Sequence, residues 1–337
     1  MTDSTQHILI IGPAWVGDMV MAQSLFMSLK QSRDVPVIDV VAPQWSLPLL
    51  ARMPEVNEGI GLPVSHRELG LGKRWRLGRQ LRANRYDQAI VLPRSYKAAL
   101  LPFFAGIPRR TGYRGEMRYG VINDIRRLDK SVLQQTVQRY VALGLDADAV
   151  EPPPVAQPAL RVDSANQSRL LKKLGLNTER PVVAMMPGAE YGPAKRWPTE
   201  YFAALATMLV DNDKQVWVLG SNKEQELGEQ IAAVDGVVNL CGQTELVDTV
   251  DLLAQCDTAV TNDSGLMHVA CASGTRVIAI YGSSDPAYTP PLSDTARVIY
   301  QQLDCSPCFE RVCPLGHTDC LNSIRPEMVF QVLESTK

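Results

Sequence analysis

The segment from Thr261 to His268 places an acid, a hydroxyl, a glycine and a histidine where a strand is expected to turn into a helix. Asp263 and Ser264 are favourable helix N-caps, and Gly265 lets a ligand approach the backbone. The free amides of a first helical turn attract anions, so this turn could hold a phosphate. An ordinary capped helix explains the same residues, and the rest of the chain must decide between the two interpretations.

A second turn with chemical potential, Gly12 to Asp18, follows the first expected strand. Gly12 and Gly17 are five positions apart with no glycine in the middle, so the turn departs from the dinucleotide-binding fingerprint. A nicotinamide-dependent oxidoreductase is therefore disfavoured. Asp18 fits two roles, a structural N-cap or a carboxylate that acts as a general base.

The third turn runs from Pro187 to Pro198 and carries two glycines, Lys195 and Arg196 ahead of a helix. Such a loop favours anion binding, although the two cations could equally form a solvated pair. It is not a P-loop, because no glycine precedes Lys195 and no Ser or Thr follows it. Glu224 follows another strand, where it could accept from ribose hydroxyls or act as a first-turn helix acid.

These turns belong to a regular alternation of strand and helix patterns, which predicts parallel α/β sheets. Strands are expected at His7 to Gly12, Pro36 to Ala42, Gln88 to Leu92, Val182 to Met186, Gln215 to Leu219, Val237 to Leu240, Thr258 to Thr261 and Arg276 to Tyr281. Helices are expected at Asp18 to Gln31, Leu47 to Met53, Trp75 to Asn84, Thr199 to Asp211, Glu224 to Ala233, Glu245 to Ala254, Leu266 to Ala272 and Pro326 to Glu334.

The chain is long enough for two domains, since 337 residues with 45% apolar content can fill two cores. The proline-rich stretch 151–158 favours an extended linker. We expect domains at 1–160 and 161–337, with a last helix at about 326–335 that packs on either of them. Two such sheets would form a ligand cleft where their strand ends face each other.

Charge is unevenly distributed along the chain. The segment from Arg67 to Arg127 holds 15 Lys or Arg against four acids, in a chain whose net charge is −2. Such a segment suggests an anionic partner, or a solvated helix face. Nucleic acid is disfavoured, because aromatic content is only 6% and no binding motif is present. No signal peptide or spanning segment is evident, so we expect a cytosolic protein.

Four of the seven cysteines lie close together in the sequence. They are Cys305, Cys308, Cys313 and Cys320, and their spacing could hold zinc or a cluster. It is not the usual pair of C-x2-C motifs, so an apolar loop, or disulfides formed only on purification, remains open.

Taken together, three motifs in this chain resemble glycosyltransferase family 9. They are Gly17-Asp18, Pro187-Gly188-Ala189 through Lys195-Arg196-Trp197-Pro198, and Asn262 through His268. The resemblance covers nearly the whole chain. It implies a GT-B fold, with two Rossmann-like domains facing each other across a cleft. It also implies an inverting, metal-independent and cofactor-free transfer of L-glycero-D-manno-heptose from ADP-heptose to the first heptose of the lipopolysaccharide inner core. Transfer to Kdo-lipid A and a sugar-nucleotide epimerase are the alternatives.

The resemblance also implies residue roles. Asp18 would be the general base, Lys195 and the amides of Ser264 and Gly265 would stabilise the departing ADP, and His268 would assist. The implied donor-binding set is Gly188, Ala189, Lys195, Glu224, Asp263, Ser264, Gly265, Leu266 and His268. Acceptor phosphates would meet Arg109, Arg110, Arg114 and Arg118, which we expect in a loop-like stretch. A lipid acceptor, heptosyl-Kdo-lipid A, implies transient contact with the inner leaflet of the cytoplasmic membrane, through basic residues with Trp75 or Trp45 nearby.

Overall fold

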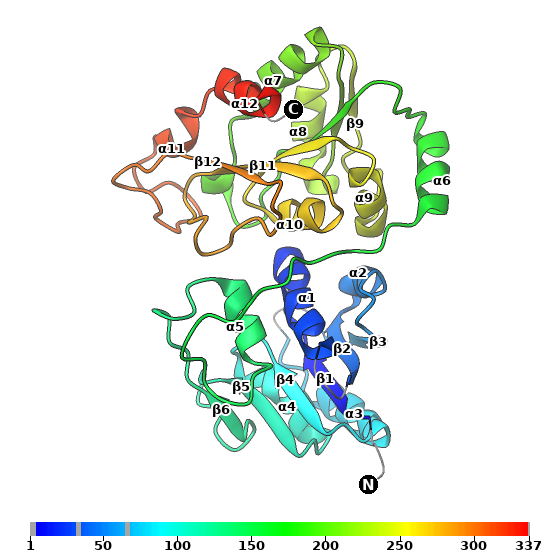
Figure 1. Cartoon of the computed structure of the whole chain (residues 1–337), viewed down its shortest axis with the longest axis vertical. Coiled ribbons are helices and arrows are strands. Elements are labelled where there is room, and N and C mark those ends of the chain that lie inside the picture. Colours follow the sequence, from blue (N-terminus) through cyan, green and yellow to red (C-terminus); the bar gives the residue numbers. More distant parts are fainter. Residues whose placement is uncertain (1–4, 32–34, 65–67, 336–337) are drawn as a thin grey trace. The chain divides into compact units, whose positions relative to one another are not determined.

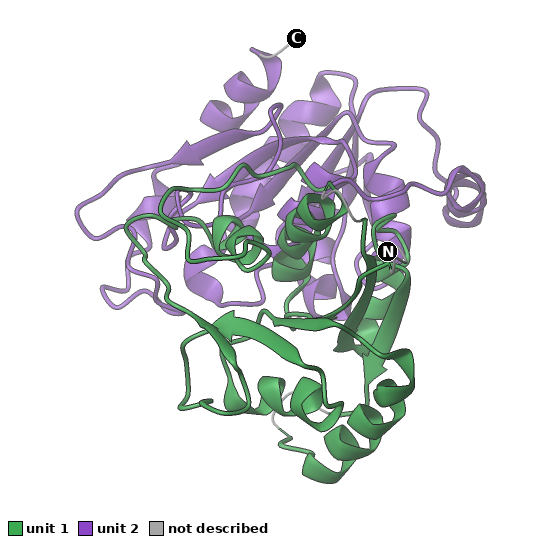
Figure 2. Cartoon of the chain, turned by 60° about the horizontal axis from the view of Figure 1, so that its bottom comes forward, with its two compact units in different colours: residues 1–158 green, residues 159–337 purple. Residues whose placement is uncertain are grey.

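A computed structural model describes residues 5–31, 35–64 and 68–335 of the chain. Arg67, the first residue of the basic segment, lies outside them. The chain divides into two compact units, Met1–Pro158 and Ala159–Lys337, coloured separately in Figure 2. They are called unit 1 and unit 2 below.

Unit 1 is built on a six-stranded sheet with the order β3-β2-β1-β4-β5-β6, in which every neighbouring pair is parallel. Its strands are β1 (His7–Ile11), β2 (Val37–Pro43), β3 (Glu58–Leu62), β4 (Gln88–Val91), β5 (Arg109–Tyr113) and β6 (Asp124–Arg126). The chain winds outward from β1 in one direction and then from β4 in the other. The topological switch point therefore lies between β1 and β4, where ligands bind in open α/β sheets.

Two pairs of helices pack in unit 1 (Figure 1). Helix α1 (Val16–Lys30) packs against α5 (Thr136–Ala142), and α3 (Leu71–Leu81) packs against α4 (Tyr96–Phe104). The short helix α2 (Leu47–Leu50) lies beside β2 and β3. Apolar side chains of α3, α4 and the central strands form one buried core cluster.

Unit 2 repeats this plan with a parallel sheet of order β12-β11-β10-β7-β8-β9. Its strands are β7 (Val182–Met186), β8 (Gln215–Val218), β9 (Val237–Asn239), β10 (Thr258–Asn262), β11 (Arg276–Tyr281) and β12 (Arg297–Tyr300). The switch point here lies between β7 and β10.

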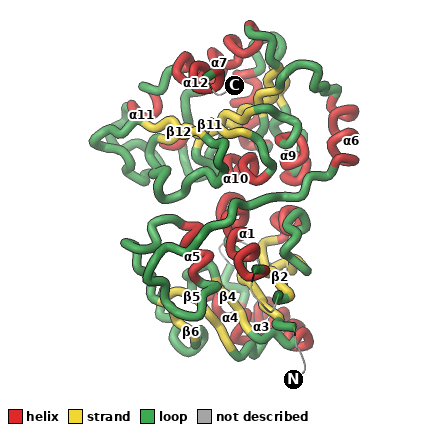
Figure 3. The backbone as a smooth tube through the Cα atoms, viewed as in Figure 1, coloured by secondary structure: helices red, strands yellow, loops and turns green. Residues whose placement is uncertain are grey.

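The helices of unit 2 form two groups. Helix α7 (Thr199–Asp211) packs against α8 (Gln225–Ile231) and α12 (Pro326–Glu334), while α9 (Leu246–Leu253) contacts α6 (Ser164–Leu174) and α10 (Gly265–Ala272). Helix α12 also contacts β11, so it packs within its own unit. Figure 3 shows long loops between β11 and α12, where only β12 and α11 (Asp319–Asn322) are regular.

The prediction of two Rossmann-like α/β folds is confirmed. One local expectation is wrong, since the stretch that holds Arg109 and Arg110 is the strand β5 and not a loop. Its buried Thr111 accepts a hydrogen bond from Gln88 (2.8 Å) and donates one to Asp124 (2.9 Å). The strand therefore buries a hydrogen-bonded polar residue, whereas a sequence pattern identifies buried strands by their apolar residues. Among the described residues, no helix is long and apolar enough to span a membrane.

Candidate active site

Three of the predicted turns follow neighbouring strands in unit 2. The turn with Lys195 follows β7, the turn with Glu224 follows β8, and the turn with Asp263 follows β10. Because parallel strands end at the same edge of a sheet, these turns gather at the carboxyl edge on both sides of the switch point. The fold thereby brings together residues that lie far apart in the sequence.

Asn262, the last residue of β10, joins two of these turns. Its side-chain Nδ2 donates to the Pro187 carbonyl (2.7 Å), and its Oδ1 accepts from the Trp197 backbone amide (2.9 Å). Asn262 is fully buried, so both ends of its amide are satisfied by protein groups. The sequence analysis gave Asn262 no role of its own. The feature that could have indicated one is an amide side chain at the last position of an otherwise mostly apolar strand.

Lys195 and Asp263 form an ion pair at this edge. The side chains are 17% and 6% exposed, so the pair is largely shielded from water. The Lys195 ammonium also lies 5.1 Å from the ring centroid of Tyr191, which the guanidinium of Arg311 approaches to the same distance. A cation held in this way could receive the negative charge of a phosphate without a large rearrangement.

His268 lies in α10, one turn after the residues that cap this helix. It is only 4% exposed, and burial lowers its pKa to about 4; nearby Asp263 raises the pKa and Lys195 lowers it further. The imidazole is therefore neutral at pH 7. Its Nδ1 has no hydrogen-bond partner among the described residues. A neutral ring can donate one hydrogen bond to an anion, but it cannot add a positive charge.

The first turn of α10 has the geometry of an anion site. Ser264 is the N-cap, and its side chain makes no capping bond to the first amides of the helix. Ser264, Gly265 and Leu266 are all half-buried rather than covered. All three belong to the donor-binding set that the resemblance implies.

Gly188 and Glu224 touch each other across β7 and β8. A Cβ atom at Gly188 would lie 2.7 Å from the Glu224 Cγ, so a larger residue there would displace the Glu224 side chain. The Glu224 carboxylate accepts from the Ser221 amide (2.9 Å) and hydroxyl (2.6 Å), in a capping box. This supports a structural role at the helix start, and ribose binding by Glu224 stays a prediction. Ala189, beside Gly188, is buried.

Asp18 lies on the β1 side of the switch point in unit 1. The N-cap of α1 is Trp15, and Asp18 is the third residue of the helix, so the N-cap interpretation of Asp18 is wrong. The helix begins earlier than its apolar pattern suggested. Asp18 is half-buried in the first turn, where the helix dipole favours a carboxylate.

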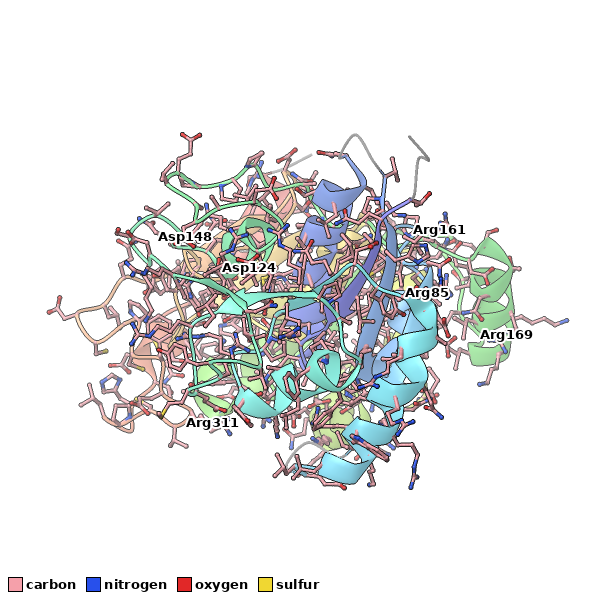
Figure 4. The ribbon with its side chains drawn as sticks, turned by 90° about the horizontal axis from the view of Figure 1, so that it is seen from below. Arg85, Asp124, Asp148, Arg161, Arg169 and Arg311 are labelled. Carbon is pink, nitrogen blue, oxygen red and sulfur yellow. The ribbon has the colours of Figure 1, made fainter. Side chains whose placement is uncertain are left out.

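The four arginines predicted to meet the acceptor have different surroundings. Arg109 pairs with Asp124 (3.0 Å), which Figure 4 labels, and Arg110 donates to the carbonyls of Val121 and Ile107. Arg118 is 2% exposed and donates to the carbonyls of Tyr113 and Pro93. Its burial argues against a contact with acceptor phosphates, because its guanidinium supports backbone carbonyls of its own unit.

Arg114 is the exposed member of the group. Its carbonyl accepts from Arg94, another exposed arginine, which follows β4 on the far side of the switch point from Asp18. Sequence reasoning counted Arg94 within the basic segment but did not single it out. Its position shortly after an apolar strand could have marked Arg94 as a candidate site residue.

The four neighbouring cysteines are free thiols, and none of the residues that the structure describes form a group of three or more metal-ligating side chains. Backbone amides, first of all that of Thr318, hydrogen-bond the Cys313 sulfur and lower its pKa, whereas burial raises the pKa of Cys320 to about 11. A metal-ligand role for Cys305, Cys308, Cys313 and Cys320 thus has no support in this geometry.

Comparison with known proteins places this site in a family. Residues 74–319 match the family model of glycosyltransferase family 9 (heptosyltransferase). The lipopolysaccharide heptosyltransferase 2 of Escherichia coli (strain K12) is 46% identical over 339 aligned positions, which cover 97% of each protein. The chain belongs to glycosyltransferase family 9. The lipooligosaccharide heptosyltransferase 2 of Haemophilus influenzae is 48% identical and covers 87% of this chain and 88% of its own.

A solved structure agrees with this family assignment. That of E. coli ADP-heptose LPS heptosyltransferase II matches with a TM-score of 0.86 and 44% identity, over 98% of each chain. The resemblance to family 9 noted from three motifs is confirmed over nearly the full length of the chain. The motif turns of this family 9 member are those that carry Asp18, Lys195 and Asp263.

Proposed function

We propose that this family 9 glycosyltransferase moves L-glycero-D-manno-heptose from ADP-heptose to the first heptose of the lipopolysaccharide inner core, as a heptosyltransferase II. The observation that carries the proposal is the shielded Lys195–Asp263 ion pair beside the open first turn of α10. It offers a cation and backbone amides to a diphosphate, and a carboxylate to sugar hydroxyls. The relatives named heptosyltransferase 2 support this choice of donor and acceptor.

The chemical step would be a single displacement at the anomeric carbon. The acceptor hydroxyl oxygen attacks C1 of the heptose, the bond from C1 to the phosphate oxygen breaks, and its electron pair leaves with ADP. The acceptor proton passes to the Asp18 carboxylate. Lys195, the amides of Ser264 and Gly265, and a hydrogen bond from neutral His268 would stabilise the charge that develops on the leaving diphosphate.

The test is release of ADP from ADP-heptose by purified protein, with heptosyl-Kdo-lipid A, with Kdo-lipid A and with no acceptor. We expect release only with heptosyl-Kdo-lipid A. Asp18→Asn should lower kcat by about 10²–10⁴, because it removes the base, and should leave ADP affinity unchanged. Release with Kdo-lipid A alone would indicate a type I enzyme, acceptor-independent turnover would indicate an epimerase or a hydrolase, and an active Asp18→Asn would remove the base assignment.

We also propose that unit 1 contacts the anionic inner leaflet of the cytoplasmic membrane through the exposed face of α3. This face carries Lys73, Arg76 and Arg79 beside Trp75, which is 50% exposed, and the Arg79 guanidinium lies 5.2 Å from the Trp75 ring centroid. Arg85, labelled in Figure 4, follows in the same basic segment. Each basic residue near an anionic bilayer contributes about 1 kcal/mol, and tryptophan favours the interface.

Co-sedimentation with vesicles tests this contact. We expect binding to vesicles that contain phosphatidylglycerol and not to pure phosphatidylcholine, and a loss of binding for Arg76→Glu with Arg79→Glu. Trp75→Ala should weaken binding. Trp45→Ala should not, since Trp45, the other tryptophan expected near the membrane, is similarly exposed but lies outside α3. Equal binding by wild type and the charge-reversal variant would contradict the proposal.

A further inference from the structure

Two serines follow β11 and are almost completely buried. Ser283 is 1% exposed and Ser284 is 3% exposed, and neither hydroxyl has a hydrogen-bond partner in the part of the chain that the structure describes. A buried hydroxyl without a partner costs free energy, and protein structures contain few of them. Two in succession call for an explanation.

The backbone around these serines is fixed by a distant segment. The amide of Phe309 donates to the Ser283 carbonyl (2.7 Å), and the Ser306 hydroxyl donates to the Gly282 carbonyl. A shift of the loop toward other partners would break these bonds. The hydroxyls are therefore held in place without protein partners, rather than lying in a loose loop.

The two serines share a sheet edge with the candidate diphosphate site. Strands β10 and β11 are parallel neighbours, and the amide of Asp263 donates to the Ile280 carbonyl (3.1 Å). After this bond, the segment that follows β10 continues into Ser264 and α10, and the segment that follows β11 continues into Ser283 and Ser284. The Nδ1 of His268, on α10, is a third buried polar atom without a partner among the described residues. Three such atoms thus belong to the segments that follow two adjacent strands, β10 and β11.

We propose that the hydroxyls of Ser283 and Ser284 donate hydrogen bonds to the diphosphate oxygens of the sugar nucleotide, and so form one wall of the donor site. This inference rests on the proposed function. The strand order favours the diphosphate over the nucleoside. The two serines follow β11, next to β10 and Asp263, whose carboxylate pairs with Lys195, whereas Glu224 follows β8 on the opposite side of β7. Neutral hydroxyl donors there would complement Lys195 without adding charge.

The inference predicts opposite effects on stability and binding. Ser283→Ala and Ser284→Ala each remove a hydroxyl that has no protein partner, so the Tm of the ligand-free protein should stay unchanged or rise. The same changes should weaken ADP binding by about 2- to 12-fold each, measured by calorimetry, since each removes one hydrogen bond to the ligand. A purely structural role would instead lower Tm and leave ADP affinity unchanged.

Two matched controls separate the causes. Thr136→Val removes another buried hydroxyl that lacks a described partner, but in unit 1, so it should leave ADP affinity unchanged. Ser306→Ala removes a paired hydroxyl from the segment that holds the backbone beside Ser283, and should lower Tm. These controls show whether a change in ADP affinity is specific to Ser283 and Ser284.

The outcomes also distinguish this inference from the proposed function. If both serine variants bind ADP with wild-type affinity, the inference is wrong. The proposed function would still stand if the wild type transfers heptose. Loss of affinity for ADP-heptose but not for ADP would place the hydroxyls on the sugar and overturn the diphosphate assignment. ADP binding that needs both serines, in a wild type that transfers no heptose, would overturn the function alone. A wild type that binds neither ADP nor ADP-heptose would overturn both.

Discussion

The candidate ligand-binding residues of the two units differ in how the protein engages them. In unit 1, Arg109, Arg110 and Arg118 are engaged by carboxylates and backbone carbonyls of the same unit. In unit 2, Lys195 and Asp263 pair with each other beside a helix terminus, and the nearby His268 keeps a buried nitrogen without a described partner. The basic segment is conspicuous in the sequence, yet most of the arginines singled out there stabilise the fold.

The difference teaches that local charge excess is weak evidence for a binding site. The segment 67–127 has a large positive charge, but some of its arginines form ion pairs with the half-buried Asp124. Burial raises the pKa of this carboxyl, yet hydrogen bonds from Arg126, Thr111 and Arg109 hold the pKa below its usual value. In unit 2, the ion pair between Lys195 and Asp263 is largely shielded from water. Shielding strengthens each remaining interaction with a ligand.

The largest effect should come from breaking the ion pair of unit 2. Lys195→Met leaves the nearly buried Asp263 carboxylate without its cation, and the free energy of unfolding should fall by about 3–5 kcal/mol. Lys195→Met with Asp263→Asn should recover much of this loss, because no uncompensated charge remains. Urea unfolding of the three proteins measures both values.

An exposed pair in the neighbouring turns provides the control for this experiment. Lys223 lies 2.7 Å from Glu190, but the two side chains are 69% and 56% exposed. Lys223→Met should therefore produce no measurable loss of stability, because water screens the pair. Equal losses for Lys195→Met and Lys223→Met would show that the donor-side pair is not shielded, and the comparison between the units would fail.

Much of the fold was predictable, because central parallel strands are continuous apolar runs. The bounds of β7 and β11 follow from their sequences alone, since both are buried on two faces. Strand β5 was missed because polar partners satisfy its Arg-Arg-Thr-Gly-Tyr sequence, and α4 because Pro102 lies inside it. Polar strands and proline-containing helices depend on contacts that no local pattern contains.

The site was predictable to the level of its turns. Ligands gather at the carboxyl ends of parallel strands, so each turn after a strand was a candidate. The pairing of Lys195 with Asp263 joins residues 68 positions apart and depends on the order of β7 and β10 in the sheet. The sequence also could not show that the Ser283 and Ser284 hydroxyls lack protein partners, because the hydrogen bonds of a hydroxyl depend on which residues the fold places around it.

A second prediction concerns the pH dependence contributed by His268. In the unfolded chain this imidazole takes up a proton near the ordinary histidine pKa of 6.5, whereas burial holds the folded pKa at about 4. The unfolded state therefore binds more protons between these values, and the free energy of unfolding falls as pH drops from 6.5 to 4. The contribution of His268 to this loss should be about 3 kcal/mol.

Comparison of wild type with His268→Gln isolates this contribution. Glutamine does not titrate, so the stability of the variant should fall less steeply over the same pH range. Urea unfolding at pH 6.5, 5.5 and 4.5 gives the two slopes. Parallel slopes would mean that His268 takes up a proton equally readily in the folded protein and in the unfolded chain. His268 would then not count among the groups of unit 2 that are shielded from water.

The smallest effect should distinguish two arginines of unit 1 that sequence reasoning treated alike. Arg118→Met removes the donors to the carbonyls of Pro93 and Tyr113, so stability should fall by about 1–3 kcal/mol. Arg114→Met, on the exposed surface, should change stability by less than about 0.5 kcal/mol. If Arg114 meets acceptor phosphates, its variant should raise the acceptor KM and leave ADP affinity unchanged. The reverse result, a stable Arg118→Met with a raised acceptor KM, would return Arg118 to the acceptor site and show that buried arginines in unit 1 serve the ligand rather than the fold.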